Sequence, residues 1–181
     1  MCRAAFARSA TVILLALAVA GCGAVRVNSY AERGFDLQRY HTFGWGAADQ
    51  HSTGDPRLDN NRFFSERIQE QVERGLLRRG LSKTTADSPD LQLHYHATWH
   101  EEIDVNTFDR GSGYTSSDDP PPFVYEAGAL TIDVVDPALG KVVWRGWAES
   151  NVSGVVDDQR WMEERIDQIV AKIMERFPHR P

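Results

Sequence analysis

The chain contains 181 residues, of which 41% are hydrophobic and 25% are charged. This composition is ordinary for a globular protein and excludes a polytopic membrane protein, a disordered chain and a collagen-like repeat. The 26 acidic residues outnumber the 20 basic ones, so the net charge is -6 and broad electrostatic binding to nucleic acid is excluded. With only two cysteines, the chain is also not a disulfide-dense scaffold.

The first 21 residues have the pattern of a bacterial signal peptide. Arg3 and Arg8 precede an apolar run over residues 11–20, which as a helix would span about 15 Å, half of a bilayer core. The run ends in Val19-Ala20-Gly21-Cys22, which resembles the lipobox of bacterial lipoproteins. In those proteins the signal peptidase cuts before the cysteine. We therefore predict a lipoprotein signal peptide over 1–21; the alternative is an ordinary secretory signal with a chance cysteine at the cleavage site.

Cys22 is the predicted lipidation site, and residues 22–24 are the lipidated cysteine with a short tether. The lipobox implies a covalent diacylglycerol on the sulfur and an N-acyl chain on the amine. At about 0.8 kcal/mol per buried methylene, two or three acyl chains hold a domain at a membrane. Position 23 is Gly and not the Asp that tends to retain enterobacterial lipoproteins at the inner membrane. We therefore expect the outer membrane, with the domain on the periplasmic face.

The mature chain is predicted to begin with two short strands and a helix. Residues 25–30 alternate apolar and polar side chains, and residues 40–45 form the second strand. The helix is expected to run from an N-cap at Asp59 or Asn60 to about Arg79. Its apolar residues recur every four positions and form one buried stripe: Phe64, Ile68, Val72 and Leu76, widened by Leu77.

Residues 90–103 form the longest predicted strand. Its apolar face carries Leu91, Leu93, Tyr95, Ala97 and Trp99, and its polar face carries Gln92, His94, His96, Thr98, His100 and Glu102. Such clean alternation predicts a sheet with one face packed and one face in water. Residues 104–123 collect Gly, Ser, Asp and three consecutive prolines, and we expect a flexible loop there.

A hairpin and a second helix complete the chain. Residues 124–136 and 141–150 are its strands. The helix is expected to run from an N-cap at Asp157 or Asp158 to about Phe177. In the second strand of the hairpin we expect three side chains on one face, Val142, Trp144 and Ala148, and four on the other, Val143, Arg145, Trp147 and Glu149.

The element order ββαβββα, with both helices amphipathic on one side only, predicts the fold. We expect a single α+β domain over 25–181: a two-layer sandwich in which two helices cover one face of a mainly antiparallel sheet of about five strands. The connection from the second to the third strand through the first helix is expected to be a parallel crossover. The second face of the sheet is expected to be largely open.

Six segments of the mature chain form a recognisable set. They are Phe35–Trp45, Asp55–Asp59, Gly80–Leu81, Asp90–Leu91, Gly128–Asp136 and Val143–Ala148. Together they resemble the domain-of-unknown-function 4136 family of bacterial lipoproteins over nearly the whole mature chain, most specifically in the hairpin ending in Trp-Arg-Gly. The resemblance implies a lipid-anchored envelope domain and implies no enzyme activity.

His94 and His96 are the candidate metal ligands. On a strand the pair would lie on one face about 6.5–7 Å apart, a spacing that suits two ligands of one zinc or copper ion. His100 would lie about 13 Å from His96 along the same face, too far to share the ion. Asp133 or Glu126 are conceivable third ligands by type. The alternative is a solvated strand face that happens to carry histidines.

Arg145 and Trp147 are the candidate partner surface. Both are expected on the open face of the sheet, where Trp and Arg are favoured interface anchors. The partner would be another envelope protein or peptidoglycan. The alternative is a single exposed tryptophan of no special role, which is common on protein surfaces.

The sequence contains no pattern of a catalytic centre. It has no Gly-x-Ser-x-Gly elbow, no P-loop and no dinucleotide fingerprint, and cleavage before Cys22 leaves no free thiol. Asp133 and Asp136 are three residues apart on a strand, so they fall on opposite faces and do not form an acid/base pair. We predict a non-enzymatic binding or assembly module with no cofactor besides its acyl chains. The alternative function is zinc or copper binding through His94 and His96.

Overall fold

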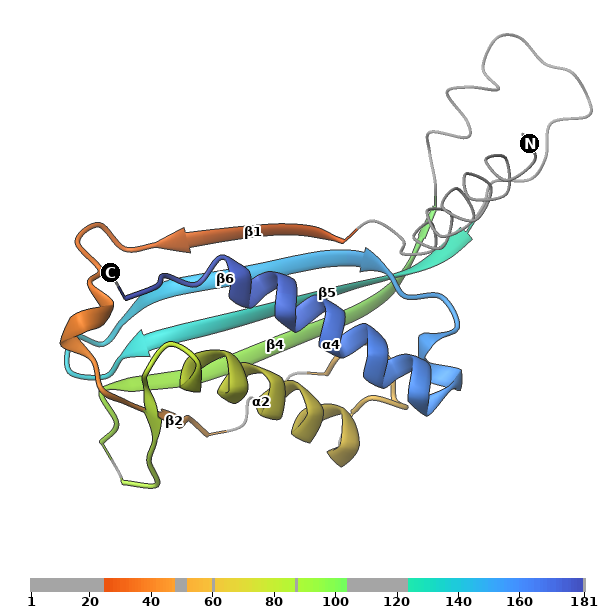
Figure 1. The fold of residues 1–181 in the computed structure, drawn as a ribbon. Helices are drawn as coiled ribbons and strands as arrows, with labels where there is room; N and C mark the ends of the chain where they lie inside the picture. The colour runs from red at the N-terminus through yellow and green to blue at the C-terminus, as the bar shows by residue number, and fades with distance from the viewer. Residues whose placement is uncertain (1–24, 48–51, 60, 87, 104–123, 181) are drawn as a thin grey trace, which may run out of the picture.

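The computed structural model describes residues 25–47, 52–59, 61–86, 88–103 and 124–180. The predicted signal peptide (1–21), the predicted lipidation site with its tether (22–24) and the predicted loop (104–123) lie outside the described residues. In the part that is described, no helix is long and apolar enough to cross a membrane. One six-stranded sheet carries two α-helices on one face (Figure 1), which confirms the predicted α+β architecture.

Six strands, two α-helices and two short 3-10 helices make up the described fold. The strands are β1 (Arg26–Ala31), β2 (Thr42–Trp45), β3 (Ser82–Lys83), β4 (Leu91–Ile103), β5 (Val124–Asp136) and β6 (Lys141–Asn151). The α-helices are α2 (Arg62–Leu77) and α4 (Gln159–Glu175), and the 3-10 helices are η1 (Leu37–Arg39) and η2 (Val155–Asp157).

The strands follow the order β1-β6-β5-β4-β2-β3 across the sheet. Strands β4, β5, β6 and β1 pair antiparallel, whereas β2 is parallel to both β4 and β3. The crossover from β2 through α2 is therefore parallel, as expected. The sheet has one strand more than predicted, because β3 contains only two residues and such a short segment shows no alternation that a sequence pattern could detect.

Helix α2 begins slightly later than predicted. Its N-cap is Asn61, whose side-chain oxygen accepts a 3.1 Å hydrogen bond from the Phe64 N–H. The prediction of Asp59 as a cap was wrong because this carboxylate is used by the preceding loop: it accepts hydrogen bonds from the Thr53 N–H and the Ser52 hydroxyl, both at 2.7 Å. The predicted apolar stripe of α2 is buried, except that Leu77 is 52% exposed and does not widen it.

Helix α4 begins where the sequence places it. Asp158 is the N-cap, and its side chain accepts a 2.9 Å hydrogen bond from the Trp161 N–H. The two helices run in the same direction, because Arg67 of α2 contacts Asp167 and Gly75 packs on Met174. A Cβ at Gly75 would lie 3.0 Å from Met174 Cε. This glycine therefore lets the helices approach closely, which offsets its low helix propensity.

Strand β6 contains a bulge that the sequence pattern does not show. Val134 pairs with Trp144 and Val135 pairs with Val142, so Val143 is the extra residue. As a result, Val143 and Trp144 are both buried in the core while Val142 is only half-buried. The prediction that Val142 packs with Trp144 and that Val143 lies opposite was wrong, because strict alternation fails at a bulge.

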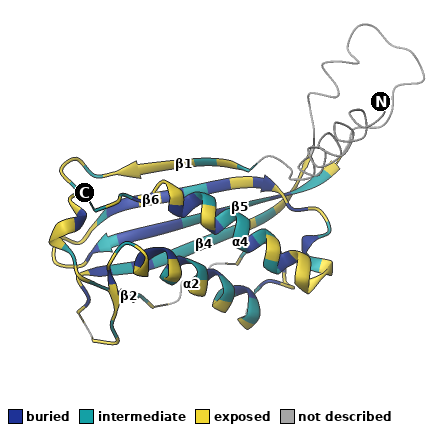
Figure 2. Ribbon diagram, in the orientation of Figure 1, coloured by how far each residue is buried: buried dark blue, intermediate teal, exposed yellow. Residues whose placement is uncertain are grey.

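The core lies between the sheet and the two helices. Figure 2 shows burial concentrated along the middle strands and along the helix faces that meet them. Trp144 packs edge-on against Phe177 with ring centroids 4.9 Å apart, and both side chains are almost completely buried. Both helices lie on the same side of the sheet (Figure 1), so no described helix covers the opposite face.

Candidate functional site

The face of the sheet opposite the helices, which we call the open face, brings the predicted site residues together. Cross-strand pairing places them in two adjacent rows that run from β4 to β1. The first row is His94, Asp133, Arg145 and Tyr30, and the second is His96, Thr131, Trp147 and Asn28. The predicted pairs His94/His96 and Arg145/Trp147 therefore form one continuous surface.

An ion pair between Arg145 and Asp133 occupies the centre of the open face. Arg145 Nε lies 2.5 Å from one Asp133 carboxylate oxygen and Nη2 lies 2.6 Å from the other, a bidentate arrangement. The hydrogen bonds and the charge of Asp133 raise the pKa of Arg145 against the opposing effect of burial. The Asp133 side chain is only 6% exposed although its strand face is open, whereas that of Arg145 is 48% exposed. The arginine therefore presents its charge to solvent over a shielded carboxylate.

The two candidate metal ligands have different surroundings. His94 lies over Gly46, where a Cβ would come within 2.2 Å of the imidazole Cε1, so any side chain at position 46 would force the ring to move. His96 Nε2 lies 3.8 Å from Asp133 Oδ2. Asp133 is the conceivable third ligand that the fold brings beside the pair, but its two oxygens are bound by Arg145.

Glu126, the other conceivable ligand, belongs to a different cluster. Its carboxylate accepts a hydrogen bond from the Gly154 N–H at 3.1 Å and lies 3.6 Å from Arg57. The described residues contain no group of three His, Cys, Asp or Glu side chains that could hold a metal ion. The geometry therefore gives the His94/His96 pair no third ligand within the described part of the chain.

Aromatic side chains lie on the β1 side of the open face. Trp147 is half-buried between Thr131 and Asn28, and Tyr30 is 51% exposed with its hydroxyl donating a 2.6 Å hydrogen bond to Glu32. Sequence reasoning did not assign Tyr30 and Asn28 to this surface. The alternation of residues 25–30 places them on one face, but only the β1–β6 pairing shows which face that is.

Asp136 lies away from the open face. Its carboxylate accepts hydrogen bonds from the Ala138 and Leu139 N–H groups at 2.9 and 3.0 Å and from the Tyr40 hydroxyl at 2.9 Å. Burial and this last hydrogen bond raise the pKa of Tyr40. Asp136 therefore stabilises the β5–β6 turn and is not positioned to act with Asp133.

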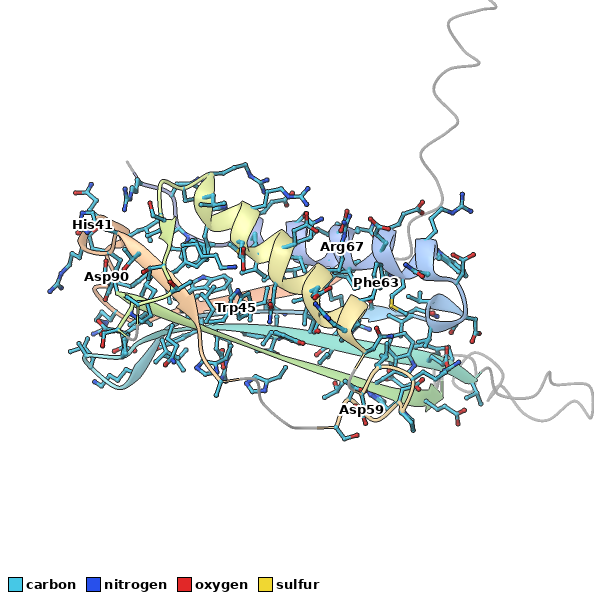
Figure 3. All side chains as sticks on the ribbon, turned by 90° about the horizontal axis from the view of Figure 1, so that it is seen from below. His41, Trp45, Asp59, Phe63, Arg67 and Asp90 are labelled. Atoms are coloured by element: carbon cyan, nitrogen blue, oxygen red, sulfur yellow. The ribbon has the colours of Figure 1, made fainter. Side chains whose placement is uncertain are left out.

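A polar cleft of about 470 Å³ lies beside this turn, and its lining includes Arg39, Ser88, Asp90 and Asp136. Asp90 accepts hydrogen bonds from the N–H groups of His41 and Thr42, which lower its pKa (Figure 3). Both carboxylates of the cleft are thus engaged by the protein's own backbone. The cleft lies where the ends of β2, β4 and β5 meet. Because its two carboxylates already accept hydrogen bonds from the protein, we do not assign it a ligand.

The sequence of this fold matches a known family. The family model "Domain of unknown function (DUF4136)" matches residues 27–179, a range that begins within β1 and ends after α4. The chain belongs to the DUF4136 family. No curated protein matches the sequence.

Solved structures resemble this DUF4136 domain in fold. A dodecamer of a PelC variant from Paraburkholderia phytofirmans is 13% identical with a TM-score of 0.50, and the match covers 87% of this chain and 100% of that one. A PDZ domain protein from Parabacteroides distasonis is 18% identical with a TM-score of 0.53, covering 88% of this chain and 36% of that one. A DUF4136 family protein from Bacteroides thetaiotaomicron is 13% identical with a TM-score of 0.46, covering 82% and 95%. At these identities the first two structures show a likeness of fold alone.

Proposed function

We propose that this DUF4136 protein is a lipid-anchored lipoprotein on the periplasmic face of the outer membrane, where its domain is a non-enzymatic binding module. The observation that carries the binding role is the open face: a side of the sheet that no described helix covers, with an arginine at its centre and aromatic side chains toward β1. Such residues are the usual anchors of interfaces. The module needs no cofactor besides the acyl chains on Cys22.

The anchor rests on the lipobox at Cys22, three residues before the first described residue, Val25. Replacement of the thiol in the full chain (Cys22→Ser) removes the acceptor of the diacylglycerol, so the protein is expected to leave the outer-membrane fraction. Cys2→Ser is the matched control, because Cys2 lies in the predicted signal peptide, and it is expected to leave membrane retention unchanged. Unchanged retention of the Cys22→Ser protein would contradict the anchor.

The binding role rests on Trp147 and its neighbours on the open face. With a photoreactive residue at the exposed Thr98 of the same face, Trp147→Ala is expected to abolish cross-linking in cells to an envelope protein or to peptidoglycan. Trp161→Ala is the matched control, because this tryptophan is 52% exposed but lies on α4, away from the face. Equal cross-linking by both variants would refute the proposed surface, provided that their melting curves match the wild type. Cosedimentation with purified cell-wall sacculi distinguishes the two partner classes.

A further inference from the structure

Strand β1 forms an unprotected edge of the sheet. Among the described strands it pairs only with β6, and the other edge of this sheet is the two-residue strand β3. All residues of β1 are exposed except Val27, which is half-buried against the core, so most of the strand is open to solvent within the described chain. Proteins usually block edge strands with proline, a bulge or a very short length. Strand β1 has no proline, and its register with β6 is unbroken over six residue pairs.

The hydrogen-bonding groups of this edge can be assigned to individual residues. The N–H of Glu32 donates to Val143 O at 2.9 Å, so Glu32 bonds toward β6. Antiparallel ladders alternate, and Arg26, Asn28 and Tyr30 therefore bond toward β6 as well. Val27, Ser29 and Ala31 then direct their N–H and C=O groups outward. These three residues supply a row of donors and acceptors along the outer edge.

We propose that β1 pairs with β1 of a second copy of this chain, in an antiparallel arrangement centred on Ser29. A two-fold axis perpendicular to the sheet places residues of the same face opposite one another. Because residues on one face of β1 are either all even-numbered or all odd-numbered, the numbers of two paired residues must add to an even total. With Ser29 opposite Ser29 of the second copy, Val27 lies opposite Ala31, and these pairs use every outward-directed group of β1. The two sheets then join into one continuous sheet.

Opposite charges on the two strands favour a second copy of this chain as the partner and favour this register. On the open face, Asn28 lies opposite Tyr30, and Arg26 lies opposite Glu32 of the second copy. The two-fold axis repeats the Arg26–Glu32 pair, so two opposite-charge pairs flank the junction, an arrangement that stabilises antiparallel strands. Arg26 is also in register with Glu149 of its own β6. In the dimer it would lie between two carboxylates.

The inference is independent of the anchor and of the open face's partner, and charge exchange tests it. Two full-length chains with different C-terminal tags are coexpressed and copurified in detergent. The wild-type chains are expected to copurify. Arg26→Glu with itself, and Glu32→Arg with itself, are each expected to lose copurification at least tenfold, because both pairs between positions 26 and 32 become repulsive. Arg26→Glu mixed with Glu32→Arg is expected to restore it, since each pair is again of opposite charge.

This rescue distinguishes dimer loss from misfolding, because a variant that fails to fold cannot be rescued by its complement. Ser29→Pro is the second test: it removes an N–H that points away from β6, so it is expected to abolish copurification with little change in the melting temperature. Arg62→Glu on α2, remote from β1, is the matched charge control and is expected to copurify normally. Absence of wild-type copurification, insensitivity to the single reversals, or failure of the mixed pair to rescue would each overturn the proposal.

Discussion

The most informative single residue is Asp133, because its carboxylate is shielded from water on a face that no described helix covers. Its position is specified by pairs on both sides: His94 opposite on β4 and Arg145 opposite on β6. The sequence predicts correctly that Arg145 lies on the open face of the sheet. It does not predict the ion pair of Arg145 with Asp133, because the register of this hairpin depends on its turn and on the bulge at Val143, which alternation does not show.

Loss of the arginine should therefore destabilise the domain. Arg145→Ala leaves the shielded Asp133 carboxylate without its bidentate partner, and we expect a loss of about 1–3 kcal/mol in the free energy of unfolding. Asp133→Ala/Arg145→Ala should be less destabilised than Arg145→Ala, because removal of both groups leaves no buried charge. Urea denaturation followed by tryptophan fluorescence measures both. Arg62→Ala breaks an exposed pair with Glu66 and serves as the control, with an expected loss below about 0.5 kcal/mol.

The histidine pair illustrates the limit of a spacing argument. A His-x-His strand does place both rings on one face, as predicted, but a metal centre needs a third ligand, and Asp133 is bound by Arg145. We expect calorimetric titrations of the full chain with zinc and with copper to be the same for the wild type and for His94→Ala/His96→Ala. A tight binding event that disappears in the double variant would instead establish the metal-binding function.

At the scale of elements, the loop before α2 is held by charges and hydrogen bonds. Arg57 donates from Nη2 to Asp55 at 2.6 Å and from Nη1 to Asp157 at 2.7 Å, which connects the loop to η2. The Thr53 carbonyl accepts a 2.5 Å hydrogen bond from the Trp99 N–H of β4. In the sequence, Gly54-Asp55-Pro56 indicates a turn but not the path of the loop. Its fixed path depends on partners that lie far away in the chain, on β4 and η2, which no local pattern reveals.

Asp55 in this loop makes the stability of the fold depend on pH. Hydrogen bonds from Arg57 lower the pKa of Asp55 in the folded state, although burial opposes the effect. A carboxylate with a lowered folded pKa stabilises the fold above its unfolded pKa of about 3.9, and this contribution is lost as the pH falls through the folded pKa. We therefore expect Asp55→Asn to be less stable than the wild type at neutral pH and to lose less stability below about pH 4. Denaturation curves from neutral to strongly acidic pH test this, and parallel losses in both proteins would contradict it.

Elements with a strong period were predicted well, and irregular ones were not. The stripe of α2 from Phe64 to Leu76 and the alternation of β4 identify their elements because burial repeats with the period of the backbone. The bulge at Val143 and the three-residue helix η1 have no repeating signal. The proposed binding surface was half predicted for the same reason: His94, His96, Arg145 and Trp147 lie on the expected face, while Tyr30 reaches it only through the pairing of β1 with β6.

At the scale of the whole molecule, the helix layer does not extend over the whole sheet. The two parallel helices cover one face over the middle strands, whereas β1 lies at the margin and is exposed except at Val27. β5 is bordered by β4 and β6 and carries almost completely buried residues such as Ile132 and Val134. Local opening is easiest where few apolar contacts are lost, so the strands should differ in stability from the centre of the sheet to its edge.

Amide hydrogen exchange should show this difference in stability between the strands and should also show whether the outer edge of β1 is paired. Amides at the centre of β5 are expected to exchange most slowly, at rates set by global unfolding. In a monomer, the outward-directed amides of Val27, Ser29 and Ala31 have no acceptor in the sheet and should exchange within the shortest labelling time. In the proposed dimer they are protected, and Arg26→Glu should remove that protection while β5 remains unchanged. Mass spectrometry of peptides covering residues 25–33 measures the difference. Equal exchange of β1 in the wild type and in Arg26→Glu would mean that no strand covers this edge.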